Sequence, residues 1–524
     1  MFWADRIANE IAAKRADAAP GKSLVIRDEK TMSGRVHVGS MRALATHGLV
    51  SEVLSESGIV NEYFYEFNDF DPFDKIPTNL DVGQFAEHLG KPLYAVPSPV
   101  EGFENYPEYF AAEYIAAHKK AGFFPTYYRA YGDLYRTGRM DALIRISLDR
   151  AADVRRINKE ISGSIKDDSW LPISVICEAC GKMTTVRPFD WDGETVAYSC
   201  DKDLPDTVSC KHSGRVAPFK GAAKLFWKVD WAAKWIAVGV DIEGGGKDHS
   251  TKGGSRDVAN NIARQVFDHA APFDIPHEFF LIGGKKMASS KGRGASAKEM
   301  SELFPSEVFR LLLIGKDINQ QIDVDPEGDS IPRLYDWYDD LAELVRQGVA
   351  DDFTRLYALC QLPENQAEIP APWQLRFGQV AFIVQMPHLS LAEEAARVKG
   401  SSLSEEELVK LEERASYARF WLASYAPEQF RFVLQDTLPS FEYTEGQKRA
   451  FALLAAFMRE GHKTGEEVHA RLHELKTEAD IKPAELFMGL YQSFLARSSG
   501  PKAGWFLSVL PREFVIARLE EAGR

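Results

Sequence analysis

The stretch that decides the fold of this chain is TMSGRVHVGS, residues 31–40. A short β-like run at 24–26 precedes it, and a plausible helix at 41–54 follows it. A strand, a glycine loop and a helix in this order place backbone N–H groups and the positive end of the helix where a triphosphate can sit. The stretch therefore predicts an α/β nucleotide fold, with phosphate contacts from Ser33, Gly34, His37, Gly39 and Ser40.

A second motif, GGKKMASSKG at 283–292, complements the first. Its lysines and hydroxyls lie on a glycine-flanked loop that can close on a leaving pyrophosphate as negative charge develops there. The two motifs together indicate an enzyme that adenylates a carboxylate with ATP. The ATP contacts expected from the second motif are Lys286, Met287, Ser289, Ser290 and Lys291. The catalytic groups expected from both motifs are His37, Lys286 and Lys291.

This pair resembles the HIGH and KMSKS signatures of the class I aminoacyl-tRNA synthetases. Ser40 stands in place of the second signature histidine, and Ser289 in place of the second signature lysine, with Lys291 as a nearby cation. Further segments from one end of the chain to the other resemble the class I lysyl-tRNA synthetases. They are FNDFDPFDKIP at 67–77, KLFWKVDWAAKW at 224–235, GGGKDHSTKGGSRD at 244–257, IPRLYDWYDDL at 331–341 and GPKAGWFLSVLPREFVIARL at 500–519.

The resemblance implies an α/β chain with a split Rossmann-like catalytic domain, a zinc-containing insertion and an all-α C-terminal anticodon-binding region. The expected segments are 1–105 and 235–285 for the catalytic domain, 106–234 for the insertion on the acceptor-stem side, 286–345 for the KMSKS loop and a linker, and 346–524 for the helical anticodon-binding domain. It also implies that L-lysine, ATP with Mg²⁺ and tRNA(Lys) are the reactants.

Four of the five cysteines fall between 177 and 210, which indicates a metal site rather than a disulfide framework. Thiolates suit Zn²⁺, and a four-cysteine site at 175–215 would stabilise a small insertion that lacks its own core. The predicted ligands of this structural zinc are Cys177, Cys180, Cys200 and Cys210. The second pair is widely spaced, so Asp203 or His212 is an alternative ligand. Four free thiols are the other alternative.

A pocket for lysine must pair a buried ammonium with a carboxylate and can enclose the aliphatic stem with aromatic rings. The residues expected to bind lysine are Asp28, Glu29, Thr31, Trp227, Asp230, Asp248 and His249. For Trp227 a helical core stripe with Trp231 and Trp235 is the alternative, because the three tryptophans are four residues apart. A structural role is the alternative for His249.

Arginines gather on LYRTGRMDALIRISLDRAADVRRI, residues 134–157. In a chain of net charge −14, this segment is the best candidate for a surface that follows RNA phosphates near the acceptor end. The expected tRNA contacts are Arg136, Arg139 and Arg145. The alternative is an exposed helix held by salt bridges.

The composition, with 45% hydrophobic and 27% charged residues, is that of an ordinary soluble protein. No apolar stretch reaches the ~20 residues that cross a bilayer, and the N-terminus lacks the apolar core of a signal peptide. A cytoplasmic monomer with no membrane partner is expected. Two other functions stay open: a different adenylate-forming enzyme, such as a nucleotidylyltransferase, and a non-catalytic RNA-binding relative.

Overall fold

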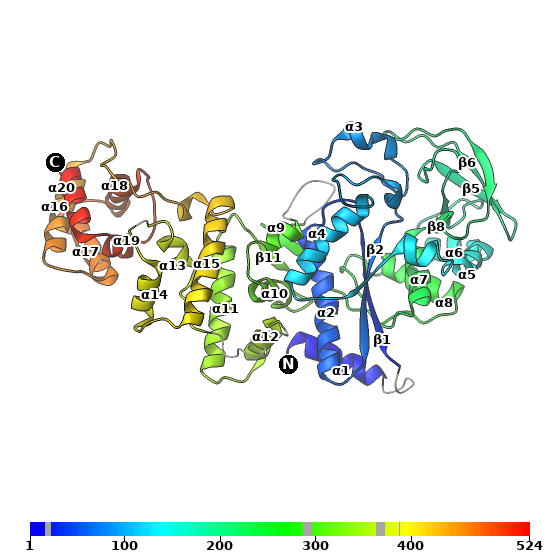
Figure 1. Cartoon of the computed structure of the whole chain (residues 1–524), viewed down its shortest axis with the longest axis horizontal. Helices are drawn as coiled ribbons and strands as arrows, with labels where there is room; N and C mark the ends of the chain where they lie inside the picture. Colours follow the sequence, from blue (N-terminus) through cyan, green and yellow to red (C-terminus); the bar gives the residue numbers. More distant parts are fainter. Residues whose placement is uncertain (16–21, 287–295, 363–371, 387) are drawn as a thin grey trace. The chain divides into compact units, whose positions relative to one another are not determined.

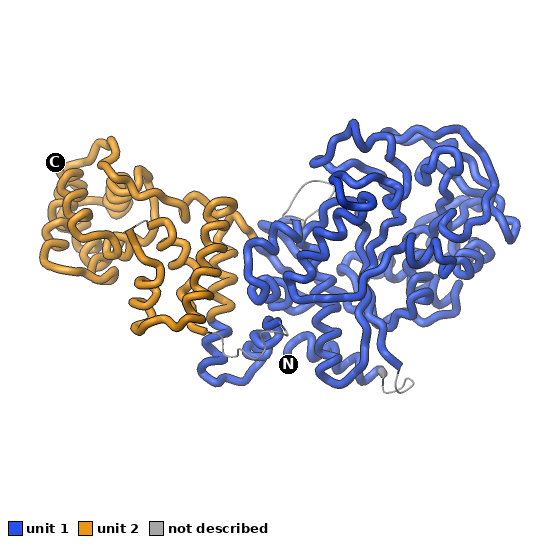
Figure 2. The backbone as a smooth tube through the Cα atoms, viewed as in Figure 1, with its two compact units in different colours: residues 1–324, 340–370 blue, residues 325–339, 371–524 orange. Residues whose placement is uncertain are grey.

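A computed structural model of the chain describes residues 1–15, 22–286, 296–362, 372–386 and 388–524 (Figure 1). These residues form two compact units (Figure 2), each described on its own below. Unit 1 comprises 1–324 and 340–370, and unit 2 comprises 325–339 and 371–524.

The second motif is described only in part. Lys286 ends strand β10 (Lys285–Lys286). Met287, Ser289, Ser290 and Lys291, for which we predict ATP contacts, lie outside the described residues.

The core of unit 1 is a parallel sheet in the order β1-β2-β3. Its strands are β1 (Leu24–Thr31), β2 (Asn61–Asn68) and β3 (Thr126–Arg129). Helix α2 (Met41–Glu56) joins β1 to β2 and packs against both (Figure 1). On the other side of β1, parallel bridges join Ile26 to Ile242 and Ile242 to Phe273. The predicted α/β fold with a parallel sheet is confirmed.

Strand β1 is longer than the sequence indicates. The β-like run ends near residue 27, whereas β1 continues through Arg27-Asp28-Glu29-Lys30 to Thr31. A buried unpaired charge would be costly in a strand. Here the fully buried Arg27 donates hydrogen bonds of 2.7 Å to both Glu66 and Glu243. Neutralisation by partners far along the chain therefore keeps this charged segment in the sheet.

Helix α4 (Tyr106–Lys120) matches the helix that the apolar spacing predicts near 106–121. It begins at Asn105, whose side chain accepts the N–H of Glu108 at 3.1 Å, and basic residues occupy its last turn. Unit 1 also contains α1 (Trp3–Arg15), which packs against α2, and the short helix α3 (Val82–Phe85).

The cysteine-containing region is built from short antiparallel strands. Strands β5 (Val186–Trp191), β6 (Val196–Cys200) and β7 (Ser213–Val216) form one sheet, and β4 (Ile173–Val175) pairs with β8 (Ala223–Leu225). The helices beside them are α5 (Asp141–Asp149), α6 (Ala151–Ser162), α7 (Trp227–Val238) and α8 (Ser255–Val266). A shared core that includes Tyr135, Tyr198 and Trp235 joins these strands and helices.

The end of unit 1 carries a second small sheet in the order β10-β9-β11. Its other strands are β9 (Phe280–Ile282) and β11 (Ile322–Val324), and nearby helices are α9 (Ala297–Ser301), α10 (Ser306–Ile314) and α12 (Asp352–Cys360). Strand β9 lies within the segment 279–284, where the sequence predicts a strand.

The described residues of unit 2 form helices joined by irregular segments, with no strand among them. Its helices are α13 (Phe377–Ile383), α14 (Leu391–Lys399), α15 (Glu405–Ser424), α16 (Glu445–Arg459), α17 (Gly465–Glu478), α18 (Pro483–Leu495), α19 (Ala503–Val509) and α20 (Arg512–Ala522), while α11 (Ser330–Arg346) carries residues of both units. Capping boxes at Ser404, Thr444 and Thr464 fix the starts of three of them.

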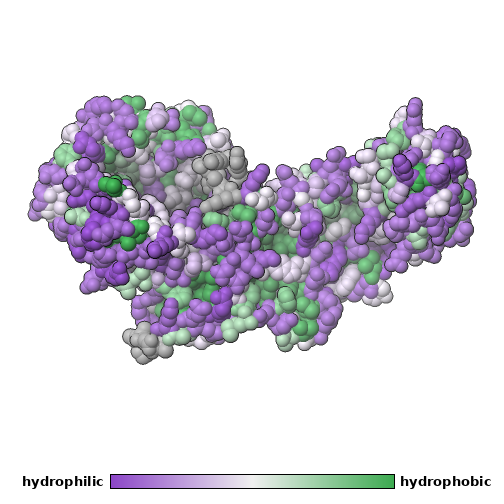
Figure 3. Space-filling model, turned by 180° about the vertical axis from the view of Figure 1, so that it is seen from behind, coloured by the Kyte–Doolittle hydropathy of each residue, from purple (hydrophilic) through white to green (hydrophobic). Residues whose placement is uncertain are grey.

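Among the described helices none combines the length and the apolar character needed to cross a membrane. The face shown in Figure 3 is mostly hydrophilic, with apolar residues scattered over it.

Candidate active site

A pocket of about 250 Å³ lies beside the carboxyl-terminal part of β1. Strand β1, the start of α2, helix α7 and the segment 243–249 contribute to its walls. The lining residues are Asp28, Glu29, Lys30, Gly39, Ser40, Ala43, Tyr65, Trp227, Trp231, Glu243, Gly244, Gly245, Gly246, His249 and His277. Of the residues we predict for lysine and ATP, the pocket brings together Asp28, Glu29, Gly39, Ser40, Trp227 and His249.

The first motif forms the entrance to α2. Gly34 has a φ of 155°, and a Cβ there would lie 3.1 Å from Pro77, so the turn favours glycine. The hydroxyl of Tyr106 donates to the carbonyl of Ser33 at 3.0 Å. A short 3₁₀ turn, Val38–Ser40, then leads into α2, with the Ser40 N–H donating to the His37 carbonyl.

The described residues that follow the second motif lie against the first. His37 forms an antiparallel bridge with Ser296, and the Ala297 N–H donates to the Val36 carbonyl at 2.9 Å. Ser296 also caps α9 through a capping box with Glu299. Ser296, the first described residue after the second motif, therefore lies beside His37.

Asp28 is linked to the glycine segment through a buried histidine. Its Oδ2 lies 3.3 Å from Nδ1 of His47, while Nε2 of His47 accepts the N–H of Gly244 at 2.8 Å. Since Nε2 is the acceptor, Nδ1 carries the proton and donates to Asp28. A Cβ on Gly244 would lie 2.1 Å from the Ile275 carbonyl oxygen, so only glycine fits this position.

Acidic groups outnumber basic ones around the pocket. Asp28, Glu29 and Glu243 line it, against the single ammonium of Lys30. Burial raises the pKa of Glu243, against the opposing charge of Arg27. Burial would also raise the pKa of Glu29, but the charges of Lys234 and Arg27 outweigh it and hold that pKa below its ordinary value. Glu29 is therefore ionised, and its side chain is 26% exposed.

Three residues that we predict to bind lysine are not among the pocket-lining residues. Asp230 is buried and forms an ion pair with Lys234 at 2.8 Å. Thr31 donates to Asp71 at 2.6 Å. Asp248 is exposed next to the glycine segment. Asp230 thus belongs to a buried ionic network behind the pocket, in which Lys234 also contacts Glu66.

The tryptophan stripe of α7 is divided between pocket and core. Trp227 is 48% exposed and stacks on Trp231, with ring centroids 5.9 Å apart and planes at 18°. The ring of His249 meets Trp227 edge-on at 5.9 Å. Trp235 is fully buried and donates to Glu243 at 2.6 Å. The core interpretation therefore fits Trp235, while Trp227 and Trp231 form an aromatic wall.

Several pocket residues escaped the sequence analysis, above all Glu243 and His277. Glu243 comes directly before the glycine segment, which is the only local signal for it. His277 is 8% exposed, and its Nδ1 has no hydrogen-bond partner among the described residues. Burial, aided by the charges of His47 and Arg42, lowers the pKa of His277 to about 3. His277 is therefore a neutral imidazole in the pocket wall.

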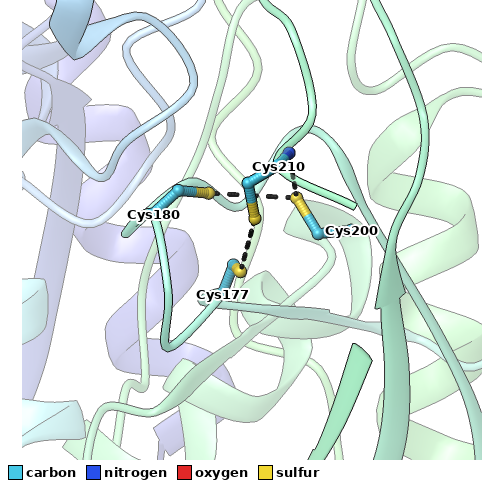
Figure 4. A group of neighbouring side chains, drawn as sticks. All are labelled: Cys177, Cys180, Cys200 and Cys210. Atoms are coloured by element: carbon cyan, nitrogen blue, oxygen red, sulfur yellow. Dashed lines mark hydrogen bonds between the residues drawn. The ribbon is translucent and has the colours of Figure 1, made fainter. Parts of the chain in front are cut away.

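The four clustered cysteines converge on one point (Figure 4). The sulfur atoms of Cys177 and Cys210 are 3.6 Å apart, those of Cys180 and Cys200 are 3.8 Å apart, and all four lie within 4.8 Å of one another. Tetrahedral zinc with bonds of about 2.3 Å requires sulfur atoms about 3.8 Å apart. The arrangement therefore fits zinc.

The alternative ligands that the spacing left open do not join this cluster. The Asp203 carboxylate accepts from the Ser209 N–H and from Lys211, both at 2.8 Å. His212 is not part of the described metal-binding group; its carbonyl accepts the Cys200 N–H at 2.8 Å.

The arginine-rich segment has two different parts. Arg136, Arg139 and Arg145 are exposed. The guanidinium of Arg145 lies over the Phe219 ring at 5.0 Å, and Arg139 donates to the Ala237 carbonyl at 2.7 Å. Farther along, Arg150 and Arg156 both pair with Asp153, as in a salt-bridged helix.

Unit 2 has a pocket of its own, of about 480 Å³. Its lining includes the acidic Glu394, which pairs with Arg397, and a group of basic side chains with one indole, namely His388, Arg397, His462, Lys463, Trp505 and Arg512. Trp505 packs on Phe382 with centroids 4.3 Å apart, whereas Phe506 is buried.

The sequence comparisons identify the family of the chain. The family model described as tRNA synthetases class I (K) matches residues 1–362. Over its full length the chain is 34% identical to a lysine–tRNA ligase of Methanosarcina barkeri, of which it covers 98%. It is 30% identical to a lysine–tRNA ligase of Archaeoglobus fulgidus, with 100% of both chains covered. The chain belongs to the class I (K) tRNA synthetases.

Among solved structures, a glutamate tRNA ligase from Elizabethkingia meningosepticum aligns with 96% of this chain and 99% of its own, at a TM-score of 0.39 and 11% identity.

Proposed function

We propose that this enzyme ligates L-lysine to tRNA(Lys) with ATP, through a lysyl-adenylate. The observation that carries the proposal is a single pocket in which acidic side chains, an aromatic wall and the first signature motif meet. Full-length relatives that are lysine–tRNA ligases support the choice of lysine.

The acids and the aromatic wall fit the two ends of a lysine side chain. An ammonium group placed near Asp28 and Glu29 would offset the excess of acidic groups in the pocket. Its aliphatic stem would lie against Trp227 and Trp231, whose rings also attract a cation. The neutral His277 adds no competing positive charge.

Adenylation requires no covalent intermediate with the protein. The lysine carboxylate attacks the α-phosphate of ATP in line, and pyrophosphate leaves. His37 and Lys286 stabilise the negative charge that grows on the leaving group, and Mg²⁺ would offset phosphate charge. A ribose hydroxyl of the terminal tRNA adenosine then attacks the carbonyl of the adenylate, releasing AMP.

The catalytic domain is proposed to be a Rossmann-like fold interrupted by the insertion 106–234. The bridges from Ile26 to Ile242 and on to Phe273 support this proposal, because they add later segments beside the first strand. Zinc held by Cys177, Cys180, Cys200 and Cys210 would stabilise the insertion, with no part in the chemistry.

Unit 2 is proposed to read the anticodon through its basic pocket. Single-stranded bases are recognised by stacking and by hydrogen bonds to their edges, for which Trp505 and the surrounding basic side chains are suited. The monomeric state and the cytoplasmic location stay predictions.

The test is ATP–pyrophosphate exchange with each of the twenty amino acids, with and without tRNA. Lysine-dependent exchange, followed by charging of tRNA(Lys), is the expected result. Exchange with a different carboxylic acid would indicate another adenylate-forming enzyme. Retained RNA binding without any exchange would indicate a non-catalytic relative.

A further inference from the structure

A stacked pair of aromatic rings lies on the surface of unit 1. The rings of Trp170 and Phe226 are parallel to within 17°, with centroids 5.3 Å apart. Phe226 is 39% exposed, and the nearby chain also exposes Ile165 to 77%. The Phe226 N–H donates to the Pro172 carbonyl at 3.1 Å, which holds the two segments together. Exposed apolar groups that are gathered in this way mark a contact surface.

Two lysines flank the stacked pair. The ammonium of Lys166 lies 5.6 Å from the centre of the Trp170 ring. Lys228 lies in the first turn of α7, where the helix dipole also favours an anion. Burial, then the charge of Lys166, lowers the pKa of Lys228. The carboxylate of the neighbouring Asp167 accepts the N–H of Ser169 at 2.9 Å. A bound anion would relieve the repulsion between the lysines.

Trp227 connects this surface to the pocket. It follows Phe226 in the chain and stacks on Trp231, and both tryptophans line the pocket. The exposed pair is therefore separated by one step along the chain from the aromatic wall of the pocket.

We propose that the aromatic-lysine surface, formed by Lys166, Trp170, Phe226 and Lys228, binds the unpaired 3′ end of the tRNA and guides it into the pocket. This inference rests on the proposed function. Bases would stack on the two rings, a phosphate would lie between the two lysines, and Trp227 would adjoin the terminal adenosine. Aromatic platforms with adjacent cations bind single-stranded nucleic acid in this way, without reading its sequence.

The experiment measures the affinity of the full-length enzyme for two tRNA(Lys) transcripts, one intact and one without its unpaired 3′ nucleotides. The wild type is expected to bind the intact transcript more tightly. In Phe226→Ala and Trp170→Ala the intact transcript should bind about tenfold more weakly, because a stacked base is lost. The truncated transcript should bind as it does to the wild type, so the difference in affinity between the two transcripts shrinks about tenfold.

Four further variants make the test specific. Phe124→Ala removes another exposed ring of unit 1 and should keep the full difference between the transcripts. Trp170→Phe should restore binding, because it keeps an aromatic face. Lys166→Ala and Lys228→Ala should each lower the salt dependence of binding to the intact transcript, by about 0.7 in the logarithmic slope. If Trp170→Ala does not fold, the exposed Phe226→Ala and the lysine variants decide the question.

The results separate this inference from the proposed function. If the wild type charges tRNA with lysine but the alanine variants keep the full difference between the transcripts, the surface has been assigned wrongly. If that difference shrinks in the variants while the wild type charges no lysine, the surface is upheld and the proposed function is wrong.

Discussion

Trp227 and Trp235 show how one repeated residue type can serve two purposes on a single helix. Both lie on α7, yet Trp227 is 48% exposed at the pocket and Trp235 is fully buried. The spacing of four indicated a common helical face but not the depth at which each ring lies, because depth depends on segments distant in the chain. Glu243, which the sequence analysis missed, accepts the indole N–H of Trp235 although it lies beyond the end of α7.

Replacing the two tryptophans should affect different properties, lysine binding for Trp227 and stability for Trp235. Trp227→Ala should raise KM for lysine about tenfold, through the loss of ~1–2 kcal/mol of stem packing and cation attraction, with little change in melting temperature. Trp235→Ala should cost about 3–5 kcal/mol of unfolding free energy because it leaves a cavity. Steady-state kinetics and thermal unfolding of both variants test this pair. An unchanged KM for lysine in Trp227→Ala would remove Trp227 from the site.

The buried histidines predict how stability depends on pH. Burial lowers the pKa of His118 to about 3. Burial, together with the charges of His47 and Arg42, lowers the pKa of His277 to about 3 as well. The unfolded chain binds protons at these positions below about pH 6.5, whereas the folded chain binds them only near pH 3. The free energy of unfolding should therefore be highest above pH 6.5 and fall towards pH 3, by about 1.4 kcal/mol per pH unit for each group.

His118→Phe tests this dependence in urea titrations between pH 4 and pH 8. The variant should lose stability less steeply on acidification than the wild type, because one group that takes up a proton only in the unfolded chain is absent. Parallel stability curves for variant and wild type would contradict the assignment of His118.

At the scale of elements, the sequence predicted pieces with strong local signals and missed features set by distant partners. The signals for helix α4 lie in its own sequence, namely the Asn105 cap and the basic residues of the last turn. The helix begins and ends close to the expected residues. Strand β1 was underestimated because its charged second half is stabilised by Glu66 and Glu243, which local patterns do not reveal. Asp230 is a similar case. The sequence predicts that it binds lysine, but it does not reveal that the Asp230 carboxylate forms an ion pair with Lys234 behind the pocket.

The glycine segment beside the pocket should tolerate substitution very unevenly. Gly244→Ala would place its Cβ 2.1 Å from the Ile275 carbonyl oxygen, so the segment must shift and the enzyme should lose stability and most of its activity. Gly245→Ala meets its nearest atom at 3.8 Å, an ordinary contact, and should melt close to the wild type. Equal melting temperatures for the two variants would show that the backbone here is not held as described.

The cysteine cluster makes a prediction about metal content. The purified chain should contain one zinc ion, and Cys210→Ser should lose it together with the stability of the strands β5 to β7. Cys360→Ala is the matched control, since Cys360 is buried outside the cluster and should leave zinc content unchanged. Atomic absorption and limited proteolysis measure both effects. Normal zinc content in Cys210→Ser would rule out the four-cysteine site.

At the scale of the whole molecule, family and reaction could be inferred from sequence because the motifs are distributed along the full chain. The match of the class I (K) family to residues 1–362 and the full-length relatives agree with that inference. The contact between the motifs could not be derived from spacing. What the structure shows is a bridge between His37 and Ser296, which follows the second motif, and the folded chain brings these two residues together across the intervening insertion.

The most direct measurement compares the Lys286→Ala and Lys285→Ala variants in lysine-dependent ATP–pyrophosphate exchange with tRNA(Lys) present. If the second motif closes over the triphosphate at the pocket, Lys286→Ala should slow exchange by about a hundredfold or more, while Lys285→Ala stays near the wild type and both bind free lysine. Exchange at the wild-type rate by Lys286→Ala would contradict the account.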